Sequence, residues 1–121
     1  WYRLAAEQGL AEAQFVLGGM YAFGGGVPQD AAEAVRWFRL AAEQGYARAQ
    51  ASLGLMYDTG EGVTQDDVQA HMWFNLVASR AAGRAREMAV EDRDLVAGRM
   101  TADQLADAQR LAREWEAAHP R

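Results

Sequence analysis

Two histidines and scattered acidic residues are the side chains of this 121-residue chain that could do chemistry. His71 falls inside an expected helix and His119 near the C-terminal end. Neither is paired with a nucleophile, and a zinc site would need ligands that the chain lacks, so neither a general base nor a zinc site is indicated. Cysteine is absent, which excludes thiolate catalysis and Cys-ligated metals together. We therefore expect no catalytic residue, no metal and no cofactor.

Two glycine-rich loops match ligand-binding loops only in part. Residues 58–62, Asp-Thr-Gly-Glu-Gly, space their acids as a calcium loop does, but the twelfth position of such a loop needs a bidentate Glu and here is Gln69. Residues 24–26 are three glycines, yet no Lys or Ser/Thr follows at phosphate-loop spacing and no strand is expected before them. The two loops lie 36 residues apart, at Gly24 and Gly60, so we interpret both as turns of a repeat.

The charge pattern excludes two further classes of partner. The net charge is −5, and an acidic chain is poorly suited to a phosphate backbone, so we expect no nucleic acid. Residues 13–29 carry no charge, but five Gly and a Pro interrupt them well short of a membrane span. We therefore expect no membrane insertion.

The elements that position these residues recur every 36 residues. When residues 1–36 are set against 37–72, Trp1 pairs with Trp37 and 21 of the 36 positions are identical, which identifies one structural unit used twice. A third copy begins at Trp73 and then diverges, since Val90 stands where Gly54 does.

Each unit is predicted to contain two helices. Asp30 has the character of an N-cap, with Glu33 at capping-box spacing, and opens a helix over about residues 31–44 that ends before Gly45. A second helix is expected over residues 47–58. Gly18 and Gly54 lie inside the second helix of their units, where glycine is unfavourable, so we expect neighbouring helices to approach closely there.

These recurring runs resemble a known family. The patterns AAEQGxAxAQxxLGxMY and GxGVxQD are similar to Sel1-like repeats (SLR), a subclass of the tetratricopeptide-like solenoids, over residues 1–78. The resemblance implies an all-α, right-handed α-solenoid of antiparallel helix-turn-helix repeats that serves as an adaptor or scaffold. It brings no catalytic residues with it.

The repeat signature fades toward the C-terminus, where residues 84–121 are predicted to close the stack. Thr101 and Gln104 form a capping-box pattern that opens a last helix reaching about Ala118. The chain is thus one repeat domain, 1–121, divided into repeat one (1–36, with its first helix shortened at the start), repeat two (37–72), a degenerate repeat three (73–100) and a C-terminal capping helix (101–121).

The candidate site is a surface formed by the first helix of each unit, which the resemblance places on the concave side. Its predicted residues are Arg3, Glu7, Arg36, Arg39, Glu43, His71, Met72 and Asn75. Such a groove could take an extended segment with a carboxylate near Arg39 and an apolar side chain near Met72. Two alternatives stay open: a merely solvated face with local Arg–Glu pairs, and a core in which Met72 packs under the C-terminal helix.

The predicted function is a non-catalytic module that binds another protein or peptide. The alternatives are a regulatory or envelope-associated domain of a larger enzyme-containing protein, and a structural spacer in a longer repeat array. The chain starts in mid-pattern at Trp1, which suggests a fragment. Its Arg-, Ala- and Gly-rich composition without Lys suggests a bacterial source, and the compartment, cytoplasm or periplasm, stays open. The uncapped N-terminal face is expected to favour end-to-end self-association.

Overall fold

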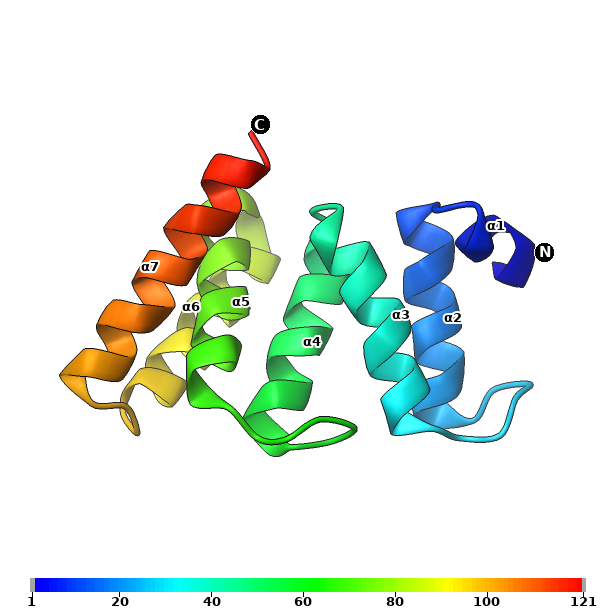
Figure 1. The fold of residues 1–121 in the computed structure, drawn as a ribbon, viewed down its shortest axis with the longest axis horizontal. Coiled ribbons are helices and arrows are strands. Elements are labelled where there is room, and N and C mark those ends of the chain that lie inside the picture. The colour runs from blue at the N-terminus through cyan, green and yellow to red at the C-terminus, as the bar shows by residue number, and fades with distance from the viewer. Residues whose placement is uncertain (1, 121) are drawn as a thin grey trace.

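Seven α-helices make up residues 2–120, the part of the chain that the computed structural model describes (Figure 1). Their bounds are α1 (Tyr2–Glu7), α2 (Ala11–Phe23), α3 (Ala31–Glu43), α4 (Ala47–Thr59), α5 (Asp67–Arg80), α6 (Gly83–Ala97) and α7 (Ala102–Ala118). We call α1, α3 and α5 the A helices and α2, α4 and α6 the B helices. The prediction of an all-α fold built from sequential helix pairs is confirmed.

The helix ends follow the local chemistry of the sequence. The Asp30 carboxylate accepts a hydrogen bond from the backbone N–H of Glu33 at 3.2 Å and so starts α3. Thr101 and Gln104 form a complete capping box at the start of α7. After α3 the chain turns at Gly45, whose φ of 86° is one that only glycine adopts readily. These three predicted boundaries are confirmed.

Each helix from α1 to α5 packs against the next, so the helices form a row with the termini at opposite ends (Figure 1). Glycines in the B helices set how closely successive units approach. A Cβ atom on Gly18 of α2 would lie 2.7 Å from Cδ1 of Phe38 in α3, and one on Gly54 of α4 would lie 2.9 Å from Cε1 of Phe74 in α5. The predicted close approach at these two glycines is confirmed.

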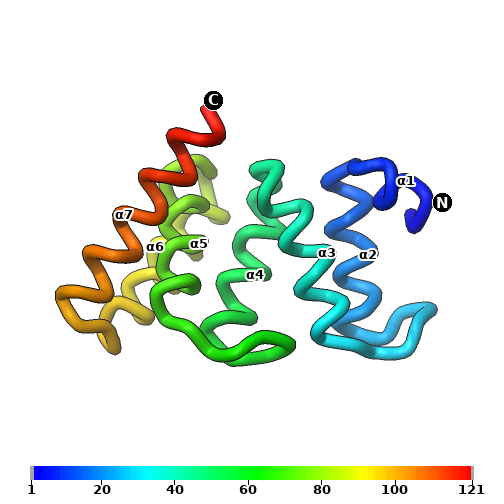
Figure 2. Tube along the Cα trace, in the orientation of Figure 1, coloured from blue at the N-terminus to red at the C-terminus, as the bar shows by residue number. Residues whose placement is uncertain are grey.

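The last helix, α7, departs from this pattern. It packs against α5 rather than against α6, the helix that precedes it, and crosses α5 at an incline (Figure 2). The sequence explains the departure. One repeat of 36 residues further along the chain, Val90 takes the place of Gly54, and Arg110 takes the place of Phe74. Both sides of the aromatic–glycine contact are therefore missing, and α7 cannot stack on α6 as α5 stacks on α4.

Buried glutamines close the C-terminal ends of two A helices. The Gln50 side chain is only 1% exposed, and its Nε2 donates a hydrogen bond to the carbonyl of Ala42 at 3.1 Å. Gln14 makes the same contact with the carbonyl of Ala6 at 3.1 Å. Each carbonyl also accepts the backbone N–H of the turn glycine that follows, Gly45 or Gly9, so the glutamine supplies a second hydrogen bond at the helix end.

Candidate functional site

The predicted row Arg3, Arg39 and Asn75 joins the A helix of each unit to its B helix. Arg3 Nη2 donates a hydrogen bond to the Tyr21 hydroxyl at 2.6 Å, and Arg39 Nη2 makes the equivalent bond to Tyr57. Both guanidinium groups also lie over the ring of the same tyrosine. The Arg39 guanidinium is thus engaged within its own unit, on the partly buried side of α3.

Unit three keeps this contact with the donor moved to the other helix. Arg93 stands in place of the tyrosine, and its Nη1 donates a hydrogen bond to Oδ1 of Asn75 at 3.2 Å. In all three units the paired residues lie 18 positions apart in the chain. The row is therefore a repeated connection between the two helices of a unit.

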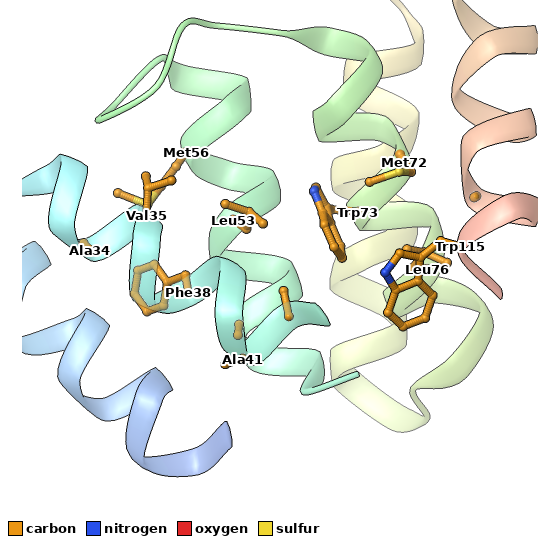
Figure 3. Packing of buried hydrophobic residues seen from close by; sticks show 13 residues of the cluster. Ala34, Val35, Phe38, Ala41, Leu53, Met56, Met72, Trp73, Leu76 and Trp115 are labelled. Atoms are coloured by element: carbon orange, nitrogen blue, oxygen red, sulfur yellow. The ribbon is translucent and has the colours of Figure 1, made fainter. Parts of the chain in front are cut away.

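His71 and Met72 lie in the interior, with exposed fractions of 4% and 6%. Met72 belongs to the same hydrophobic cluster as Trp73, Leu76 and Trp115 (Figure 3). The alternative in which Met72 packs under the C-terminal helix therefore describes the structure, and the exposed groove around Met72 is corrected accordingly. Burial lowers the pKa of His71, and the nearby positive charge of Arg93 lowers it further.

The C-terminal half of α7 covers the A helices at the third unit. The indole N–H of Trp115 donates a hydrogen bond to Oε2 of Glu43 at 3.2 Å, and the Trp115 ring stacks on His119 at a centroid distance of 3.9 Å. The hydroxyl of Ser79 donates to Oε1 of Glu116 at 3.1 Å. Predicted residue Glu43 therefore has an internal partner.

The part of the predicted surface that stays accessible lies on α1 and α3. We define the A stripe as the face that carries Leu4 and Glu7 on α1, Arg36, Leu40 and Glu43 on α3, and the equivalent Met72, Leu76 and Ser79 on α5. Leu4 and Leu40 are 60% and 41% exposed, whereas Leu76 in the same place on α5 is fully buried.

Arg36 carries the positive charge of the A stripe. Its side chain is 55% exposed and pairs with Glu33 at 3.3 Å, and its guanidinium lies over the Trp37 ring at 4.5 Å from the centroid. This predicted residue can therefore reach a carboxylate of a bound segment by exchanging a weak surface ion pair for another.

A second surface, missed from the sequence, is an apolar groove between the B helices α2 and α4. It is lined by Phe15, Gly19, Ala22, Phe23, Phe38, Ser52, Leu55, Met56 and Glu61, with a volume of about 320 Å³. Phe23 is 87% exposed at its edge. The signal in the sequence was that unit one has aromatic residues at positions 15 and 23, where unit two has Ala51 and Thr59.

Between residues 2 and 120, no cluster of three or more His, Asp or Glu side chains could hold a metal ion. Asp58, the first acid of the loop that resembled a calcium site, is paired with Arg99, which also bonds Asp67 at 2.7 Å. Across the same residues, no helix combines the length and the apolar character that crossing a bilayer requires.

The arrangement has relatives among known proteins. A family model described as the Sel1 repeat matches residues 1–10, 11–46 and 47–80. The crystal structure of c5321, a protective antigen present in uropathogenic Escherichia coli strains and displaying an SLR fold, superposes with a TM-score of 0.87 at 37% identity. That match covers 97% of this chain and 24% of the other, so the chain spans about a quarter of that protein.

A Sel1 repeat protein from Oxalobacter formigenes is similar with a TM-score of 0.70 at 40% identity, over 75% of this chain and 68% of the other. Comparison with curated proteins finds no match. The repeated helix pairs and the sequence runs that define them are thus shared with solved bacterial structures.

Proposed function

Because the chain belongs to the Sel1 repeat family, we propose that it is a non-catalytic module that binds a segment of another protein on the A stripe of its first two units. Sel1 repeats generally mediate protein interactions. The observation that carries the proposal is the contrast between leucines at equivalent positions. Leu76 is covered by a helix, whereas Leu4 and Leu40 are exposed on the same side of the molecule.

The chemistry of the stripe defines the segment that it suits. Leu40 offers an apolar contact, Arg36 offers a guanidinium for a carboxylate, and Glu7 adds an acceptor at the edge. An apolar centre with a charged rim is the usual composition of such interfaces. A segment with an apolar side chain and a nearby acid would match this arrangement.

The groove between α2 and α4 is a rival location for the same function, favoured by the exposure of Phe23. It is more apolar than the A stripe and has one acidic side chain, Glu61, at its rim. The two surfaces share only α3, where Phe38 lines the groove, so a bound peptide would perturb largely different residues in the two cases.

A peptide selected from a random-peptide display library against the folded protein tests the proposal. Its binding is followed by the change of backbone amide NMR shifts on titration. The proposal expects the largest changes in α1 and α3, around Leu4 and Leu40. Changes confined to α2 and α4 would assign binding to the groove, and failure to select any binder would favour the spacer function.

A further inference from the structure

The helix α7 lies on the α5 part of the A stripe as a separate amphipathic helix. Only Ala108, Ala112 and Trp115 of its residues are buried, and they follow one another at spacings of four and three along one face. By comparison, α5 buries eight of its residues. The apolar contact of α7 with the rest of the fold therefore comes from two small side chains and one large one, together with the partly buried Leu111.

Contacts of Trp115 and Glu116 fix the position of this helix along the stripe. The Trp115 ring packs edge-on against Trp73, with 6.1 Å between centroids, and the Arg80 guanidinium lies over the Trp115 ring at 4.9 Å. Next to the tryptophan, the Oε2 atom of Glu116 lies 3.8 Å from Nε of Arg80. Peptide helices bind by laying an apolar face with a large anchor residue into an apolar groove, and Trp115 of α7, with the Glu116–Arg80 pair beside it, has this arrangement.

The surface beneath α7 has the composition of a binding groove. It presents Met72, Trp73 and Leu76, with Arg80 at one edge. Methionine, aromatic residues and arginine are the types enriched where proteins bind each other. Because α7 makes few contacts with α6, its departure would leave the packing of α5 on α4 and α6 in place.

We propose that the α5 part of the A stripe is a second docking site, closed by α7, whose partner is an amphipathic helix with the chemistry of α7. Such a helix carries two small residues four apart, a tryptophan three residues later, and then an acid. It binds by displacing α7 from Met72, Trp73 and Leu76. This inference rests on the proposed function, since both use the A helices, but it concerns a different part of the stripe.

The probe for this site is a fluorescently labelled peptide of residues 101–121, titrated into the full chain and into its Trp115→Ala variant. In the unmodified chain the attached α7 competes at a high effective concentration and should suppress binding. The variant loses the indole contacts to Glu43, Trp73 and Arg80, so it should bind the peptide at least about tenfold more tightly. A peptide with alanine in place of its own tryptophan is the matched control and should not bind.

Hydrogen exchange on the unmodified chain gives a readout that does not depend on the variant folding. The proposal expects the amides of α7 to exchange as a group and faster than those of α5. Equal protection of α7 and α5 would overturn it, as would a folded Trp115→Ala variant that binds the peptide no better than the unmodified chain. A Leu40→Asp substitution should leave this peptide binding unchanged, so failure of the proposed function on α3 is distinguishable from failure here.

Discussion

Glycine has opposite roles at two adjacent positions of α2. Gly18 faces the Phe38 ring so closely that a methyl group would also come within 3.3 Å of the backbone oxygen of Ala34, whereas nothing lies within 4 Å of a methyl group on Gly19. The first glycine therefore permits the packing of one unit on the next. The second has open space beside it and weakens the helix.

Alanine at these two positions should accordingly shift stability in opposite directions. Gly18→Ala forces Phe38 or the backbone of α3 to move and should lower the free energy of unfolding by about 1–3 kcal/mol. Gly19→Ala should raise it by about 0.5–1 kcal/mol through helix propensity alone. Urea unfolding of both variants measures the difference, and a stabilised Gly18→Ala variant would contradict the close approach.

His71 makes stability depend on pH. Its pKa is lowered in the folded chain by burial and by Arg93, with Asp94 opposing the shift, so between the lowered value and 6.5 the unfolded chain binds more protons than the folded chain. The stability that His71 contributes is complete above pH 6.5 and is lost as pH falls from 6.5 to the lowered pKa. His71→Val introduces the valine that unit two has at the equivalent position, Val35. This substitution should flatten the decline of Tm between about pH 7.5 and 5.5. An unchanged decline would show that other groups cause it.

Unit three joins its A and B helices with a different pair of residues than the other two units. Units one and two use an arginine on the A helix and a tyrosine on the B helix, while unit three uses Asn75 and Arg93. The contact is retained although both residues changed. An alignment of the repeats therefore shows two substituted positions, whereas the structure shows that the interaction between them is kept.

A double-mutant cycle tests whether Asn75 and Arg93 stabilise the fold through their contact with each other. Asn75→Arg alone sets two guanidinium groups against each other, and Arg93→Tyr alone removes the charged donor. The combined variant restores the pair of units one and two, so it should be more stable than the sum of the single effects predicts, by about 0.5–1.5 kcal/mol. Additive effects in thermal or urea unfolding would mean that the two side chains act independently.

The helices could be predicted from the sequence more completely than their packing. Capping residues such as Asp30 and Thr101 act within one turn of the chain, so their effect is visible locally. The position of α7 depends on Val90 and Arg110 together, from two different helices, and no local pattern reveals that they would have to meet. The same reason explains Met72, for which the sequence pattern predicts a place in the groove, because the helix that covers it, α7, lies far along the chain.

The N-terminal end of the row exposes apolar side chains. Leu4 and Leu10 are 60% and 53% exposed, and Leu10 borders a small pocket with Ala11 and Ala13. The prediction of end-to-end association through this face stays a prediction; Trp1, which it also involves, lies outside the described residues. Leu10→Asp should then lower the concentration-dependent mass measured by sedimentation equilibrium. A mass independent of concentration in the unmodified chain would argue against the association.

The central claim is that the accessible A stripe of the first two units binds the partner segment. The most direct test compares the affinity of the selected peptide for two variants with matched substitutions, Leu40→Asp on α3 and Leu55→Asp on α4, whose leucines are 41% and 53% exposed. Both should keep the Tm of the unmodified chain, since each leucine is a surface residue. We expect Leu40→Asp to weaken binding at least about tenfold and Leu55→Asp to leave it unchanged. The reverse pattern, or equal binding by both variants, would contradict the claim.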